Sequence, residues 1–168
     1  MLVYLMMGTQ PPGSCGPFAP SRVVRFGFAL AAFYNFCIIA FSRFFSSNLG
    51  EIDPLFSREG CFCILLWGCA YLSIGGMYDA VPWTSAVFCV EKLFYGVHWV
   101  LWLLDHNETG RKSLRELFAS DPLVGMFYAV YGAGDILFAL FFYRVFQNSI
   151  KRFAEGEYGV VYGALKKN

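Results

Sequence analysis

VPWTSAVFCVEKLFYGVHWVLWLLD, residues 81–105, is a stretch long and apolar enough to cross a membrane as a helix. A second such stretch, PLVGMFYAVYGAGDILFALFFYRVF, occupies residues 122–146. Both carry charge near their centres, Glu91 and Lys92 in the first and Asp135 in the second. Charge at that depth costs a few kcal/mol or more per group, so these side chains are expected to face the protein interior and to have partners.

The composition places the chain among helical membrane proteins. Of its 168 residues, 57% are hydrophobic and 15% are charged, whereas soluble domains are about 45–50% apolar and about 25% charged. The net charge is +1 and no basic stripe is present, so we expect no nucleic acid as a partner. No P-loop, G-x-S-x-G, H-E-x-x-H or zinc-binding cysteine–histidine pattern is found, so an enzyme is not the favoured reading.

The pattern predicts an all-α polytopic membrane protein, an antiparallel bundle of four transmembrane helices within residues 23–146. The expected spans are 23–45, 60–77, 81–105 and 122–146, flanked by an irregular Pro/Gly-rich N-terminal arm (1–22) and a polar C-terminal tail (147–168). The short link at 75–80 makes the second and third spans antiparallel neighbours. Ser113 and Glu116 form a capping-box pattern, which predicts a short helix on the membrane surface.

Four spans would place both termini on the same side of the membrane. That side carries seven basic residues and the other side five, which favours termini facing the cytoplasm or its equivalent. The glycosylation sequon Asn107-Glu108-Thr109 lies on the opposite side and agrees with this orientation. Nothing in the sequence indicates the organelle.

The buried charges are expected to form one polar cluster. Successive residues of a helix point about 100° apart, so Glu91 and Lys92 face different neighbours, and Lys92 is expected to pair with Asp135 or with Glu91. Tyr95 and His98, four and seven positions after Glu91, lie on the same helix face as Glu91. Asn35 lies near the middle of the first expected span. The expected intramembrane cluster is Asn35, Glu91, Lys92, Tyr95, His98, Tyr131 and Asp135.

Three roles for this cluster remain open. It could be a structural network that fixes helix packing, or Glu91, His98 and Asp135 could face a cavity and move protons or bind a polar ligand group. A pigment or metal site through His98 is the third role, but no second histidine has ligand spacing, so no metal is predicted. No cofactor is predicted either, although a bound lipid or pigment fits the aromatic content.

Glu91-Lys92-Leu93-Phe94-Tyr95, Trp99, Trp102 and the run Tyr131–Phe138 carry a resemblance to a known group. With these residues, the segment 55–146 resembles small uncharacterised four-helix membrane proteins found mainly in bacteria. The resemblance implies that the charged positions are a signature of the group, and it implies no activity.

Two functions follow as hypotheses. The first is an accessory or structural subunit of a larger membrane complex, with membrane lipids and other membrane protein subunits as partners. The alternative is a carrier or enzyme for a lipid-soluble small molecule or proton that uses Glu91, Asp135 and His98. An open cavity beside the cluster would favour the second hypothesis, and a fully packed network would favour the first.

Overall fold

The computed structural model describes residues 21–46, 49–108 and 113–154. Within these ranges the chain forms helices and turns and no strand. The elements are α2 (Arg22–Phe36), α3 (Ile38–Phe41), α4 (Leu49–Ile52), the 3-10 helix η1 (Pro54–Phe56), α5 (Arg58–Ile74), α6 (Pro82–Glu108), α7 (Leu114–Ser120) and α8 (Pro122–Ala154). Most of the predicted N-terminal arm, the sequon residue Thr109 and residues 155–168 of the predicted tail lie outside the described residues.

Three helical segments are long and apolar enough to cross a membrane: Arg22–Phe41, Pro82–Asp105 and Pro122–Arg152. The described part of the protein is therefore all-helical, with three candidate spans. The helix α5, expected as a fourth span, has 17 residues and extends about 26 Å at roughly 1.5 Å per residue. That length is slightly below the roughly 30 Å of a hydrocarbon core, so α5 is too short to count as a candidate membrane span.

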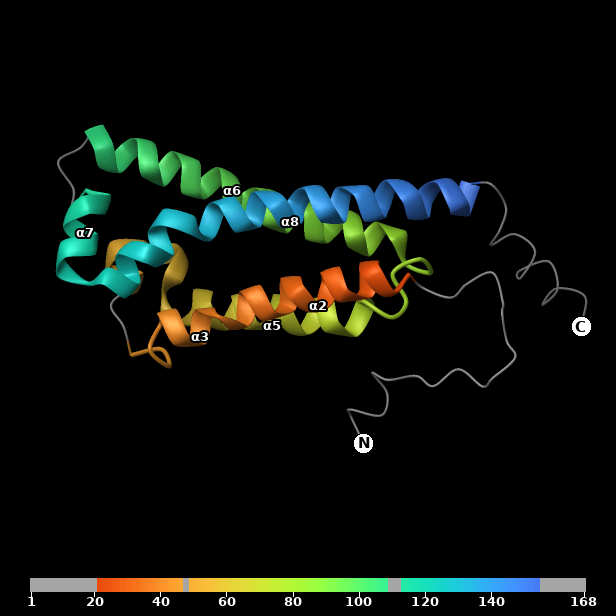
Figure 1. Cartoon of the computed structure of the whole chain (residues 1–168), viewed down its shortest axis with the longest axis horizontal. Coiled ribbons are helices and arrows are strands. Elements are labelled where there is room, and N and C mark those ends of the chain that lie inside the picture. The colour runs from red at the N-terminus through yellow and green to blue at the C-terminus, as the bar shows by residue number, and fades with distance from the viewer. Residues whose placement is uncertain (1–20, 47–48, 109–112, 155–168) are drawn as a thin grey trace, which may run out of the picture.

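The long helices lie side by side in two antiparallel pairs, α2 with α5 and α6 with α8 (Figure 1). One end of the molecule joins the start of α2, the α5–α6 link and the last turns of α8. There Tyr78 Oη accepts a hydrogen bond from the Ser21 amide at 3.0 Å, and Asp79 binds Ser149 Oγ at 2.7 Å and Arg152 Nη1 at 3.1 Å. Burial raises the pKa of the Tyr78 phenol, which favours its neutral form.

The opposite end holds the short elements α3, α4, η1 and α7. Arg43 and Asp121 form an ion pair there with 2.7 Å between Nη2 and Oδ2, and Tyr128 Oη donates to the Leu49 carbonyl at 3.3 Å. The predicted capping box is present on α7, because Ser113 and Glu116 each accept a hydrogen bond from the other residue's backbone amide. The first two contacts hold the ends of α3 and α4 against Asp121 and α8, and the capping box stabilises the start of α7.

Two helix ends differ from the expected spans by more than three residues. The first span was expected to reach residue 45, but the helix ends at Phe41 because Arg43, Phe44 and Phe45 have φ values of 49°, 56° and 64°. A right-handed helix cannot continue through left-handed backbone. The last span was expected to end at residue 146, but α8 continues to Ala154, and the contacts of its final turns with Asp79 hold it there.

A polar layer divides the apolar core into two halves. One half, which includes Phe28, Phe88 and Phe142, lies towards the α5–α6 link. The other half, which includes Phe56 and Tyr128, lies towards α7. Along α2, α6 and α8 the change from one half to the other falls at the expected polar positions, which are Asn35, Lys92 and Asp135.

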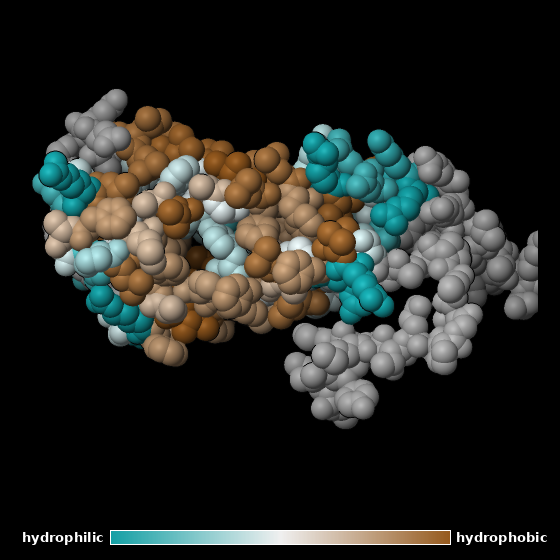
Figure 2. Space-filling model, viewed as in Figure 1, coloured by the Kyte–Doolittle hydropathy of each residue, from teal (hydrophilic) through white to brown (hydrophobic). Residues whose placement is uncertain are grey.

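The surface is apolar along the middle of the visible face and hydrophilic towards both ends (Figure 2). Many large apolar side chains on the long helices are exposed, among them Phe26, Phe33, Phe94, Leu101 and Leu137. An apolar belt between two polar ends is the surface expected of a protein surrounded by lipid.

Candidate functional site

The centre of the polar layer is a buried ion pair between α6 and α8. Lys92 Nζ lies 2.6 Å from Asp135 Oδ1 and donates a second hydrogen bond, also at 2.6 Å, to Asn35 Oδ1. Asn35 Nδ2 in turn donates to the Ile64 carbonyl at 3.0 Å, which brings in α5. Lys92 and Asp135 are 1% and 4% exposed, so the pair is removed from solvent. This chain of bonds joins all four long helices at one level.

Glu91 has a hydrogen-bond partner of its own, a tyrosine. Tyr71 on α5 donates its hydroxyl hydrogen to Glu91 Oε2. The other carboxylate oxygen, Oε1, is buried and has no hydrogen-bond partner among the described residues. Each of the two neighbouring charges of α6 therefore has its own contacts, as expected from the angle between them.

Two glycines let α8 approach the helices that contribute to the site. A Cβ on Gly132 would lie 2.2 Å from Trp99 Cγ, and one on Gly134 would lie 2.6 Å from the Tyr34 hydroxyl oxygen. Because each glycine carries only a hydrogen atom in place of a side chain, the Tyr34 ring can lie against α8. There its hydroxyl donates a hydrogen bond to the Tyr131 carbonyl. Small residues at helix contacts are the usual means of close approach in membrane proteins.

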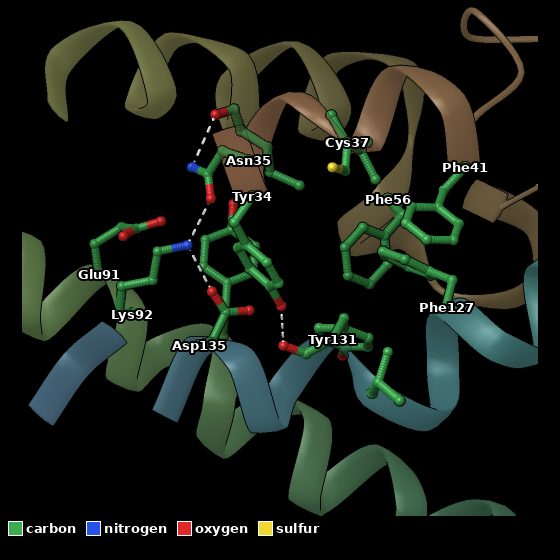
Figure 3. A pocket seen from close by; sticks show the side chains of 14 residues that line it. Tyr34, Asn35, Cys37, Phe41, Phe56, Glu91, Lys92, Phe127, Tyr131 and Asp135 are labelled. Carbon is green, nitrogen blue, oxygen red and sulfur yellow. Dashed lines mark hydrogen bonds and ion pairs between the residues drawn. The ribbon is translucent and has the colours of Figure 1, made fainter. Parts of the chain in front are cut away.

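A cavity of about 260 Å³ lies beside this network. Figure 3 shows its two unlike ends: Glu91, Lys92 and Asp135 gather at one end, and the rings of Phe41, Phe56 and Phe127 lie at the other. The aromatic side chains that line it are Tyr34, Phe41, Phe56, Tyr95, Phe127 and Tyr131. Such a cavity is mostly apolar with a few polar groups at one end, the usual character of a small-molecule site.

The cavity has a side opening between α2 and α8, which have few contacts with each other. Val130 of α8 lines the cavity and is 52% exposed, and Tyr34 and Cys37, at the end of α2 and beside it, are half-buried. Figure 2 shows a hollow on this face, between α8 and α2. The opening lies along the apolar middle of the molecule and not at either polar end.

The structure brings together six of the seven expected cluster residues and places His98 elsewhere. Asn35, Glu91, Lys92, Tyr95, Tyr131 and Asp135 all line the cavity. His98 does not line it; its Nε2 lies 2.8 Å from Asp53 Oδ2, in the segment between α4 and η1. His98 is on the same side of α6 as Glu91, but about 10 Å further along the axis, so it reaches the α4–η1 segment instead.

Sequence reasoning missed three partners: Tyr71, Tyr34 and Asp53. A signal for Tyr71 was present, because Ile64, Gly68 and Tyr71 have the i, i+4, i+7 spacing of one helix face, and all three are buried. Asp53 directly precedes Pro54, a pattern typical of a helix start, and that pattern indicates no further role for its carboxylate. It does accept a hydrogen bond from the Leu55 amide at 3.0 Å, but its second oxygen binds His98.

No family model, curated protein or solved structure matches the chain. The resemblance to small four-helix membrane proteins therefore stays a prediction from the residues. Within the described ranges, no three His, Cys, Asp or Glu side chains are grouped so that they could hold a metal ion. Fold and site together define a class: an all-helical protein with candidate membrane spans and a small, mainly aromatic cavity next to a buried ion pair.

Proposed function

We propose that this protein binds a small lipid-soluble molecule within the membrane, as a carrier or sequestering protein. The observation that carries the proposal is the cavity beside the Lys92–Asp135 pair, open at the side between α2 and α8. A network that served only helix packing would need no hollow next to it, because protein interiors are otherwise close-packed.

The size and shape of the cavity support a small ligand. Its volume of about 260 Å³ is just below the roughly 300–1,000 Å³ of pockets for drug-sized ligands, so it suits one ring or the end of a longer lipid. The phenylalanine rings would contact the apolar part of the ligand. The accessory-subunit role rests on the sequence alone and stays a prediction.

Toluene is expected to bind the full-length protein in lipid nanodiscs, because an apolar cavity gains contacts when a ring of matching size fills it. Isoleucine methyl NMR gives a local readout. The methyl signals of Ile38 and Ile64, which line the cavity, should shift on titration, and those of Ile74, which does not line it, should stay unchanged.

Blocking the opening provides the matched control. Val130→Trp should abolish these shifts, whereas Leu137→Trp should leave them intact, because Leu137 is exposed on the same side of α8 but does not line the cavity. Equal shifts in both variants, or no shift in the unaltered protein, would argue against ligand binding in this cavity.

We further propose that α5 crosses the membrane as the fourth span, with the termini facing the cytoplasm or its equivalent. Tyr71 and the Ile64 carbonyl of α5 bind the polar layer at the same level as α2, α6 and α8. The helix also runs antiparallel to both of its neighbours in the chain, so residues 42–46 and 49–57 lie at the opposite end of the molecule from residues 75–81 (Figure 1).

The four-span topology predicts opposite locations for two links. A linker with a glycosylation sequon is inserted at Ser46 or at Gly76 in an Asn107→Gln background and translated with microsomes. We expect modification at Ser46 and none at Gly76. Modification at both positions, or at neither, would show that α5 does not cross.

A further inference from the structure

The polar side chains at one end of the cavity are bound to one another. Lys92 donates to both Asp135 and Asn35 at 2.6 Å. Its ammonium group also lies 5.1 Å from the centre of the Tyr34 ring, so that ring face is already occupied. The Tyr34 hydroxyl donates to the Tyr131 carbonyl. These groups therefore use their bonds within the protein.

Two polar atoms at this end have no hydrogen-bond partner among the described residues, Glu91 Oε1 and the Tyr131 hydroxyl oxygen. Both atoms are buried beneath their neighbours, out of reach of a water molecule, so a ligand in the cavity cannot bond to them either. A polar group that entered the cavity would give up its bonds with water or lipid headgroups and find no free partner among these groups. Such a loss is costly.

The walls that a ligand does meet are mainly hydrocarbon. The rings of Phe41, Phe56 and Phe127 lie at the end away from the ion pair (Figure 3), and Ile38 and Val130 add to the lining. Walls beside empty space forfeit their dispersion contacts, so an apolar group is stabilised when it fills that space.

The side opening lies near the depth at which lipid chains end. Tyr34 is next to Asn35 in the sequence, and Val130 lies about 7.5 Å along α8 from Asp135, five rises of roughly 1.5 Å. Asp135 lies near the middle of the candidate span Pro122–Arg152. A hydrocarbon core is about 30 Å thick, so the chain ends of the two leaflets meet about 15 Å from either surface, close to this opening.

Building on the binding function proposed above, we propose that the ligand is a long-chain lipid, bound by the unsubstituted hydrocarbon end of its chain. The chain end enters between α2 and α8 and lies against Phe56 and Phe127, while the polar head stays at the membrane surface. No polar group of the ligand enters the cavity, and binding involves no covalent step.

Two probes of the same chain length test this class of ligand. Dodecanol has a hydroxyl group at one end of its chain, and dodecanediol has one at each end. Dissociation constants come from the Ile38 and Ile64 methyl shifts in nanodiscs and are corrected for the partition of each probe into the lipid. We expect dodecanediol to bind about tenfold more weakly than dodecanol, the order expected when one hydroxyl loses its hydrogen bonds.

The orientation of the bound chain has a direct readout. In deuterated lipid, nuclear Overhauser effects should connect the Ile38 and Ile64 methyl groups with the terminal methyl group of dodecanol, and not with the CH₂ group that carries its hydroxyl. Val130→Trp should abolish these effects, and Leu137→Trp should leave them intact, because only Val130 lines the cavity.

Glu91→Gln provides a second control, because it keeps the shape of the side chain and removes its charge. It should leave the ratio of the two dissociation constants unchanged, since Glu91 Oε1 does not meet the ligand. A changed ratio would show that this carboxylate contacts the ligand, which would overturn the proposal. If the variant does not fold, the ranking of the two probes on the unaltered protein still decides.

The remaining outcomes separate this inference from the function on which it rests. Dodecanediol binding as tightly as dodecanol would overturn the chain-end proposal. Toluene binding without dodecanol binding would also overturn it but leave the cavity as a ligand site. If none of the three molecules binds, both proposals are wrong.

Discussion

Lys92→Met is expected to lower the free energy of unfolding by about 3–5 kcal/mol. The substitution keeps a long apolar side chain but leaves Asp135, which is 4% exposed, without its cation. It also removes the donor to Asn35. Unfolding of the purified protein in one fixed detergent mixture, followed by circular dichroism, measures the loss. The exposed Lys151 provides the control, because Lys151→Met removes a charge without breaking this network.

A double variant separates the ion pair from simple packing. Lys92→Met combined with Asp135→Leu removes both charges, and buried pairs replaced by apolar residues often lose little stability. The double variant should therefore recover most of what the single variant loses. If the double variant instead loses as much free energy of unfolding as the two single variants together, the lysine contributes through its packing and not through its charge.

Gly132→Ala is expected to destabilise the protein by about 1–3 kcal/mol through overpacking. The new methyl group would lie 2.2 Å from Trp99 Cγ and 2.3 Å from Trp99 Cβ. The ring cannot easily turn away, because Trp99 Nε1 donates to the Tyr128 carbonyl at 2.7 Å. The two helices with the most extensive mutual contact, α6 and α8, would have to separate.

The same substitution at another glycine serves as its control. A Cβ on Gly76, in the α5–α6 link, would meet no atom within 4 Å. Gly76→Ala should therefore leave the midpoint of thermal unfolding nearly unchanged, while Gly132→Ala lowers it. Equal midpoints for the two variants would mean that α6 and α8 do not approach each other closely at Gly132.

The sequence predicted the long helices because a membrane leaves few choices. A long apolar segment in lipid must bond its own backbone groups, so the runs at 81–105 and 122–146 had to be helices. One partner of the central charges also followed from helix geometry: a rotation of about 100° separates Glu91 from Lys92, and Asp135 was one of the two partners expected for the lysine. In the structure, Lys92 binds Asp135.

The cavity and the partners that the sequence did not predict depend on how the helices are placed against each other. Local sequence patterns do not record that placement. Tyr71 reaches Glu91 only because α5 lies against α6 at a particular height. His98 leaves the cluster because the irregular segment around Asp53 folds back to meet it, and no periodicity describes such a segment. The cavity is the space that side chains of four helices leave unfilled, so no single stretch of sequence encodes it.

For the ligand binding proposed above, the side opening between α2 and α8 determines how the affinity must be expressed. A ligand that enters there comes from the hydrocarbon phase and need not return to water. Occupancy then follows the mole fraction of ligand in the surrounding lipid, not its total concentration in the sample. Adding empty vesicles would dilute the ligand and empty the site at constant total ligand, so two laboratories with different lipid-to-protein ratios would measure different apparent constants for the same molecule.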